Sequence, residues 1–157
     1  MDSEPERRKA LSLAYDLLAG RQRSEAEMRA HLRRSGISDT TIDDTVAALA
    51  RQGLLDDRAF AAAWTEGRQS SRPRSRRLLN RELRSKGVDD ETAVDATQAV
   101  DDDATAADLA RRRAPILRGL DRATAMRRLS DYLLRRGFDG ETVRRAVRTA
   151  LTDADDS

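Results

Sequence analysis

Residues Gly53 to Val88, GLLDDRAFAAAWTEGRQSSRPRSRRLLNRELRSKGV, contain an arginine-dense turn followed by a predicted helix. Within it, residues 68–86 hold eight basic residues against one acid, Glu82, which gives that segment a net charge of +7. The basic residues are Arg68, Arg72, Arg74, Arg76, Arg77, Arg81, Arg84 and Lys86. At about 100° per residue, a helix over 74–86 places four of them on one stripe, roughly opposite Leu79 and Leu83. That stripe is Arg74, Arg77, Arg81 and Arg84. Because guanidinium groups bind phosphates and carboxylates bidentately, the stripe is either a binding surface for an anionic partner or a solvated helix face.

Three glycines mark an internal repeat. Gly36, Gly87 and Gly137 lie 51 and 50 residues apart, and the residues around them match in several columns. The matched columns are Met28, Leu79 and Leu129; Leu32, Leu83 and Leu133; Ile37, Val88 and Phe138; Thr41, Thr92 and Thr142; and Ile42, Ala93 and Val143. We expect each glycine to end a helix in the left-handed C′ conformation. The residues expected to cap the next helix are Ser38, Asp89 and Asp139.

The repeat predicts an all-α protein of three tandem three-helix repeats, at residues 8–53, 54–101 and 102–152. No stretch alternates apolar and polar residues as a half-buried strand would. Because a repeat of about 50 residues has little core of its own, we expect the repeats to lean on one another in an elongated, curved array. The predicted helices are 9–19, 25–34, 40–51, 58–69, 74–86, 90–100, 104–118, 122–136 and 141–152.

Alanine and leucine supply most of the predicted core. The first repeat is expected to bury Leu11, Ala14, Leu17, Leu18, Ile42, Val46 and Leu49. In the second, Phe60 and Trp64 share a helix face at i,i+4 spacing, which favours packing over a role as an exposed stacking platform. The third is expected to bury Leu109, Ile116, Leu117, Met126, Leu129, Leu133, Phe138, Val143 and Val147, and Pro115 should kink or end its first helix.

Charge is segregated along the chain although the formal net charge is only +2. Residues 89–108 hold eight acids and no base, whereas residues 111–148 hold twelve arginines against four acids. Such blocks favour an oriented electrostatic partner. The sequence has no cysteine, no apolar run of the length of a membrane span and no apolar signal core, so we expect a soluble cytoplasmic protein without membrane association.

Candidate catalytic chemistry is sparse. His31 is the only histidine and has no partners at metal-ligand or triad spacing. Asp101, Asp102 and Asp103 are better explained as a helix start than as a magnesium site, and the pair Asp56–Asp57 as a helix cap. No nucleotide-binding or nucleophile-elbow motif occurs. We therefore predict a binding protein that is not an enzyme and that needs no metal or cofactor.

The run LLDDRAFAAAW, followed by an arginine and by LLNRELRSKGV, resembles the central signature of the RecX family, regulators of the RecA recombinase. The residues that carry this resemblance are Asp56, Asp57, Phe60, Ala61, Arg68, Glu82, Leu83, Lys86 and Gly87. SEAEMRAHLRRSGIS is similar to the first repeat of the family, through Arg21, Ser24, Glu27, Met28, Leu32 and Gly36. One segment departs from the pattern: RPRS at 72–75 replaces a glycine-rich turn, and since proline is tolerated in a first helical turn, we expect an early helix start there.

The resemblance implies that the protein binds the RecA–single-stranded-DNA filament and suppresses ATP hydrolysis, strand exchange and co-protease action. It thereby implies a role in homologous recombination, DNA repair and the SOS response, and we expect a monomer. The residues assigned to filament contact are Arg68, Arg72, Arg74, Arg77, Arg81, Arg84, Lys86, Arg127, Arg128, Arg144 and Arg145. Two alternatives stay open: a stand-alone DNA-binding protein of tandem helix-turn-helix-like units, and an adaptor that binds an acidic helical protein.

Overall fold

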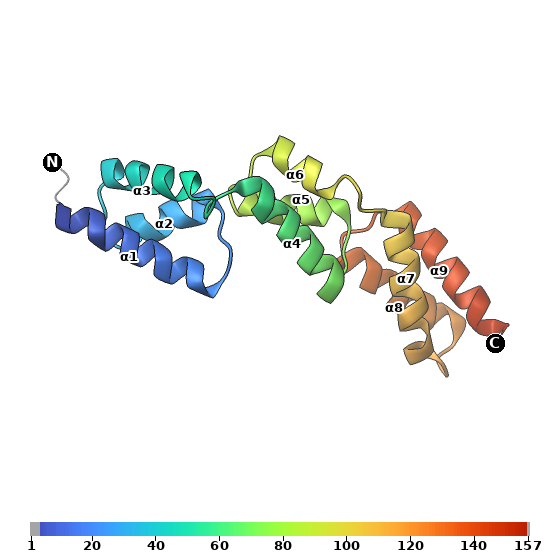
Figure 1. The fold of residues 1–157 in the computed structure, drawn as a ribbon. Helices are drawn as coiled ribbons and strands as arrows, with labels where there is room; N and C mark the ends of the chain where they lie inside the picture. The colour runs from blue at the N-terminus through green and yellow to red at the C-terminus, as the bar shows by residue number, and fades with distance from the viewer. Residues whose placement is uncertain (1–3, 157) are drawn as a thin grey trace. The chain divides into compact units, whose positions relative to one another are not determined.

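The structure is a computed structural model that describes residues 4–156. These residues form nine α-helices, one 3-10 turn and no strand (Figure 1). The elements are α1 Glu4–Gly20, α2 Glu25–Arg34, α3 Asp39–Arg51, α4 Asp57–Ser71, α5 Arg76–Ser85, α6 Asp90–Thr97, α7 Asp102–Arg113, η1 Ala114–Leu117, α8 Arg122–Arg135 and α9 Gly140–Asp155. Within residues 4–156, every helix is too short or too polar to cross a membrane. The all-α prediction is confirmed.

The middle helix of each group ends as predicted. Gly36, Gly87 and Gly137 all have positive φ, between 82° and 90°, so each holds the left-handed conformation that an L side chain resists. Ser38 and Asp139 accept hydrogen bonds from the backbone N–H of the residue three positions on. Asp89 accepts both the N–H (2.8 Å) and the hydroxyl (3.0 Å) of Thr92, and these bonds lower the pKa of Asp89.

Three apolar clusters fill the interior. The first packs α1, α2 and α3 around Met28, Leu32 and Leu49. A smaller cluster joins Phe60, Ala61, Leu83, Val88 and Ala93, with Trp64 half-buried against it. The third and largest packs α7, η1, α8 and α9 around Leu129, Leu133 and Phe138. The predicted packing of Phe60 with Trp64 is confirmed, since their ring centroids lie 6.0 Å apart.

The chain divides into two compact units. One holds the residues up to Trp64 together with Glu82–Ala96, and the other holds Thr65–Arg81 together with the residues from Thr97 onward. The division falls inside α4 and α5, so the middle group of helices contributes to both units. The predicted repeat boundaries and the predicted curved array stay predictions.

Two predicted core residues are exposed. Ile116 is 67% exposed because the helix predicted over 104–118 ends at Arg113 and continues as a 3-10 turn around Pro115. With three residues per turn, Ala114 and Leu117 face the core and Ile116 faces outward. Met126 is 43% exposed because α8 directs Ala125, one residue earlier, into the core. The predicted break at Pro115 is confirmed, whereas burial of Ile116 and Met126 is wrong.

Candidate functional site

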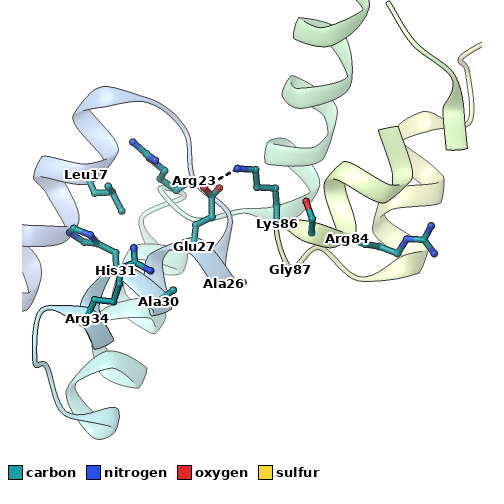
Figure 2. A pocket seen from close by; sticks show the side chains of 11 residues that line it. Leu17, Arg23, Ala26, Glu27, Ala30, His31, Arg34, Arg84, Lys86 and Gly87 are labelled. Atoms are coloured by element: carbon teal, nitrogen blue, oxygen red, sulfur yellow. Dashed lines mark ion pairs between the residues drawn. The ribbon is translucent and has the colours of Figure 1, made fainter. Parts of the chain in front are cut away.

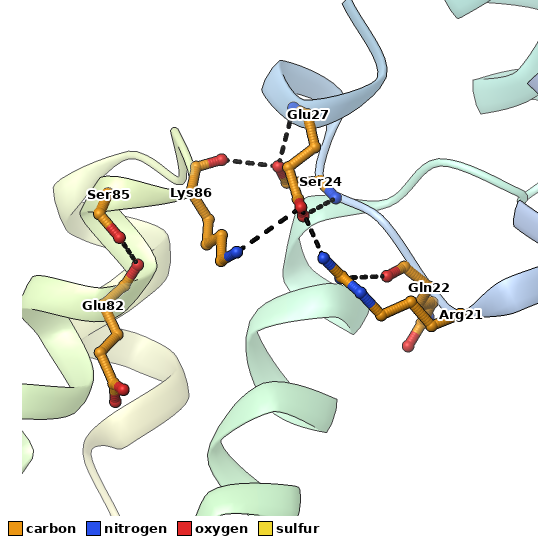
Figure 3. A network of polar contacts seen from close by, with 7 residues as sticks. All are labelled: Arg21, Gln22, Ser24, Glu27, Glu82, Ser85 and Lys86. Atoms are coloured by element: carbon orange, nitrogen blue, oxygen red, sulfur yellow. Dashed lines mark hydrogen bonds and ion pairs between the residues drawn. The ribbon is translucent and has the colours of Figure 1, made fainter. Parts of the chain in front are cut away.

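Three contacts tie the start of α2 to the second group of helices, all within the first compact unit; we call them the first joint. The Ser24 hydroxyl donates to the carbonyl of Lys86 (2.6 Å), and the Glu25 N–H donates to Asp57 Oδ1 (2.9 Å). Gly87 packs on Ala26 so closely that a Cβ at Gly87 would overlap the Cβ of Ala26. Figure 3 shows Ser24 reaching the Lys86 carbonyl.

Glu27 completes the first joint through a capping box. The Ser24 hydroxyl accepts from the Glu27 N–H (3.1 Å), and the Glu27 carboxylate accepts from the Ser24 N–H (3.2 Å). The same carboxylate pairs with Arg21 (2.8 Å) and Lys86 (3.7 Å). Burial alone would raise the pKa of Glu27, but the bonds from Arg21 and Ser24 and the charges of Arg21 and Lys86 lower it below its ordinary value.

An equivalent second joint lies within the second compact unit, at the start of α5. Here the Ser75 N–H donates to the carbonyl of Arg136 (3.0 Å), and the Arg76 N–H donates to Asp102 Oδ1 (2.9 Å). Gly137 packs on Ser75 and Leu78, and a Cβ there would come within 2.8 Å of the Leu78 Cβ. The Ser75 hydroxyl accepts from the Leu78 N–H (3.1 Å), so it caps α5.

This cap corrects the predicted stripe. Because Ser75 starts α5 at Arg76, Arg74 precedes the helix, and the early helix start expected from Pro73 is wrong. Arg74 Nε instead donates to the carbonyl of Arg72 (2.9 Å). The helix therefore carries three arginines of the stripe, Arg77, Arg81 and Arg84.

The residues of the predicted family motif build the first joint and the core beside it. Asp56 caps α4 by accepting from the Arg58 and Ala59 N–H groups (3.0 and 3.2 Å), which confirms the capping prediction for Asp56. Asp57 is the first residue of α4 and accepts instead from the Glu25 N–H at the start of α2. Burial and the neighbouring carboxylates raise the pKa of Asp57 against the effect of its hydrogen bond. Three further motif residues, Phe60, Ala61 and Leu83, are buried in the core. Gly87 packs against Ala26, and the backbone carbonyl of Glu82 accepts a hydrogen bond from the Ser85 hydroxyl.

A pocket of about 390 Å³ opens beside the first joint (Figure 2). Its basic lining residues are Arg23, His31, Arg34, Arg84 and Lys86, and its one carboxylate is Glu27, which is already paired. The Arg23 Nε is buried without a hydrogen-bond partner. Lys86 Nζ also lies 5.3 Å from the centroid of the Trp64 ring. The lining therefore favours an anionic group such as a carboxylate or phosphate.

The three arginines on α5 all lie on its exposed side, as their i, i+4 and i+7 spacing requires. Arg77 donates to the carbonyl of Gly137 (3.3 Å), which ties its side chain to the second joint. Arg84 lies 3.7 Å from Asp90 and extends away from Glu27 in Figure 2. A guanidinium has five N–H donors in a planar fork, the geometry that carboxylates and phosphates bind.

The other predicted contact residues fall on several elements. Arg68 is half-buried on α4, and Arg72 is exposed just after it. Arg127 and Arg128 on α8 and Arg144 on α9 are exposed. Arg145 pairs with Asp103 (2.8 Å) and Glu141 (3.3 Å), so part of its charge is balanced within the chain. The assignment of all eleven residues to partner contact stays a prediction.

Three consecutive aspartates serve three different contacts. Asp101 caps α7, Asp102 holds the start of α5, and Asp103 pairs with Arg145. The helix-start explanation is confirmed for Asp101. Among residues 4–156, no three His, Cys, Asp or Glu side chains are grouped as metal ligands.

The site residues predicted from the sequence do not include the contacts of the second joint or Arg136. A signal for them exists: Ser24 and Ser75 lie 51 residues apart, the same offset as Gly36 and Gly87. The predicted helix over 74–86 instead places Ser75 in its first turn, after the cap position, so the prediction misses the equivalence of Ser75 and Ser24.

Family models match the chain in all three groups of helices. The description "RecX, first three-helix domain" matches residues 10–49, "RecX, second three-helix domain" residues 56–96, and "RecX, third three-helix domain" residues 101–147.

Similar proteins come from several bacteria. Regulatory protein RecX of Amycolatopsis mediterranei (strain U-32) is 41% identical over 139 residues, covering 85% of this chain and 79% of its own. Regulatory protein RecX of Prosthecochloris aestuarii is 36% identical over 151 residues, covering 96% and 99%. The crystal structure of RecX from Lactobacillus salivarius superimposes with a TM-score of 0.81 at 19% identity, over 94% of this chain and 98% of that one, which shows a shared fold.

Proposed function

This chain belongs to the RecX family, and on that premise we propose that it regulates the RecA recombinase by binding the RecA–single-stranded-DNA filament. Binding suppresses ATP hydrolysis, strand exchange and co-protease action. The protein acts in the cytoplasm, as a monomer and without a cofactor or catalysis of its own. Its place is in homologous recombination, DNA repair and the SOS response.

The observation that carries this proposal is the exposed arginine face of α5. Leu79 and Leu83 are fully buried on the opposite side of the helix, so packing fixes which side of α5 faces solvent. Arg77 is held by its hydrogen bond to the Gly137 carbonyl, and Arg84 is held by contacts that include Asp90. An anchored guanidinium loses less side-chain freedom on binding than a mobile one, which favours recognition of carboxylates or phosphates on a filament.

The pocket beside the first joint supports a second contact to the same partner. Its basic lining residues surround a single carboxylate that is already engaged. A carboxylate of a protein partner would add charge-assisted hydrogen bonds there. Arg127, Arg128 and Arg144 add exposed positive charge on the last two helices. Engagement at several places raises the overall affinity through effective concentration.

The test follows RecA ATP hydrolysis on single-stranded DNA while the protein is titrated in. We expect the wild-type chain to lower the rate, and the triple variant Arg77→Glu, Arg81→Glu and Arg84→Glu to require at least about tenfold more protein. The matched control changes three exposed arginines elsewhere, Arg7, Arg51 and Arg118, to glutamate. It alters net charge equally and should act like wild type. If both variants lost inhibition of RecA ATP hydrolysis equally, only net charge would matter, and the α5 face would not be the contact surface.

The same titration separates the alternatives. A stand-alone DNA-binding protein would leave RecA ATP hydrolysis unchanged and bind bare DNA with a steep salt dependence. An adaptor for an acidic helical protein would leave RecA ATP hydrolysis unchanged and would not bind bare DNA.

A further inference from the structure

A second basic surface lies within the second compact unit. It is a groove of about 270 Å³ formed by the segment after α4, the end of α7, η1 and α8. Its basic lining residues are Arg72, Arg112, Arg113 and Arg136, and none of its lining residues is acidic. Only Arg72 belongs to the set that the sequence assigned to partner contact.

Tyr132 organises the groove. The guanidinium carbons of Arg113 and Arg136 lie 5.0 and 5.1 Å from the centroid of its ring, within the range of cation–π contacts. Arg136 is further held by donating to the carbonyl of Pro73 (2.9 Å). Two guanidinium groups, one from α7 and one from the end of α8, are therefore oriented by the same ring before any ligand binds.

The arginines in and around this groove repel one another. Burial lowers the pKa of Arg136, and the positive charges of Arg72, Arg74 and Arg113 lower it further, against the favourable effect of Tyr132. Asp108, which does not line the groove, pairs with the lining residue Arg112 (3.1 Å) and with Arg111. Arg72, Arg112 and Arg113 are exposed and Arg136 is half-buried, and like charges held together around a groove attract an external anion that relieves their repulsion.

Apolar surface adjoins this charge. Ile116, the 67% exposed residue of η1, lines the groove with Leu109 and the ring of Tyr132. A nucleic-acid strand combines regularly spaced negative phosphates with apolar sugar and base faces. We propose that this groove binds the backbone of a single-stranded nucleic acid, with Arg72, Arg113 and Arg136 on the phosphates and Ile116 against sugars or bases.

The test measures binding of a fluorescein-labelled thymidine oligonucleotide by anisotropy over a salt series, with no RecA present. The variant Arg112→Gln with Arg113→Gln removes two charges without introducing repulsive ones. We expect its dissociation constant to rise at least about tenfold, and the slope of log K against log salt to fall by about one to two. The control variant, Arg7→Gln with Arg51→Gln, removes two exposed arginines that line a shallow hollow in the first compact unit, and should stay within about twofold of wild type.

A second variant separates positioning from charge. Tyr132→Leu keeps every arginine and an apolar side chain against the third core, but removes the ring that orients Arg113 and Arg136. It should weaken binding with the salt slope unchanged, because the number of phosphates neutralised stays the same. Circular dichroism confirms that each variant is folded.

Three outcomes would overturn the proposal. The first is unchanged oligonucleotide binding by the Arg112 and Arg113 variant. The second is equal competition by poly-glutamate, which would assign the groove to an acidic polypeptide. The third is equal competition by inorganic phosphate at matched ionic strength, which would reduce the groove to a general anion site. Since RecA is absent, none of these outcomes bears on filament regulation through α5.

Discussion

The two joints place equivalent residues in contact but use different donors. In the first joint the Ser24 hydroxyl reaches the carbonyl before Gly87, whereas in the second the Ser75 backbone N–H reaches the carbonyl before Gly137. The cause is the residue three positions after each serine. Glu27 accepts the Ser24 N–H and leaves only the hydroxyl to donate, but Leu78 cannot accept, so the Ser75 N–H stays available.

The same substitution changes the electrostatics. Glu27 balances Arg21 and Lys86 at the first joint, whereas Leu78 offers no charge to Arg77 and Arg136 at the second. The first joint therefore pairs Arg21 and Lys86 with a carboxylate of its own. The second leaves a cluster of arginines that an external anion can satisfy, and this difference carries the proposed nucleic-acid groove.

The largest expected effect comes from a methyl group at the joint glycines. Gly87→Ala and Gly137→Ala combine a strained positive φ with overlap of a neighbouring side chain, so we expect a loss of about 2–4 kcal/mol in the free energy of unfolding. Gly87→Ala should cost more, because the new Cβ would overlap the Cβ of Ala26, whereas at Gly137 the Ser75 hydroxyl can rotate away and the Leu78 Cβ lies farther off, at 2.8 Å. Urea denaturation measures both.

Gly36→Ala is the matched control. Gly36 has the same positive φ but open space around it, so only the backbone strain of about 1 kcal/mol should remain. Equal losses at Gly36 and Gly87 would show that the seating of Gly87 on Ala26 contributes nothing.

Removal of the two serine hydroxyls should separate the joints. Ser24→Ala loses both the cap of α2 and the bond to Lys86, at about 2 kcal/mol, whereas Ser75→Ala loses only the cap of α5, at about 1 kcal/mol. Thermal unfolding of the two variants gives the comparison. A larger loss from Ser75→Ala would contradict the donor assignment.

The aspartate contact is where the two joints should behave alike. Asp57 and Asp102 each accept a first-turn N–H at 2.9 Å, so Asp57→Ala and Asp102→Ala should each cost about 1 kcal/mol. Denaturant midpoints that differ by the equivalent of more than about 1 kcal/mol would break this equivalence.

The smallest effect is the pH dependence of the first joint. The pKa of Glu27 in the folded protein lies below its ordinary value of 4.5, so its ionised form stabilises the fold above that pH, and this contribution is lost as the pH falls through the folded pKa. Glu27→Gln should therefore lower stability by about 0.5–1 kcal/mol at pH 7 and approach wild type below pH 4.5. Melting curves between pH 3 and 7 measure this, and Leu78→Gln, the equivalent change at the second joint, should show a pH-independent difference.

Patterns within one repeat predicted most of the fold. The glycine columns and capping residues gave the helix ends, because these depend on contacts three or four residues away. The two errors come from local geometry that changes over a single residue. The cap of α5 is Ser75, so the helix does not start early at Pro73, and the 3-10 turn directs Ile116 outward, although burial was predicted. The α5 arginines follow from spacing, but the anchoring of Arg77 on Gly137 joins residues 60 positions apart and has no local signature.

By itself, the sequence determined an all-α chain of three similar helix groups and its family, since helix capping, glycine conformation and hydrophobic spacing act locally. Only the tertiary structure decided that Gly87 and Gly137 are also packing surfaces and that the Asp102 carboxylate caps α5. It alone gathered Arg72, Arg113 and Arg136 with Tyr132. The physical reason is that these contacts join residues brought together by helix packing, and their charges interact through space instead of along the chain.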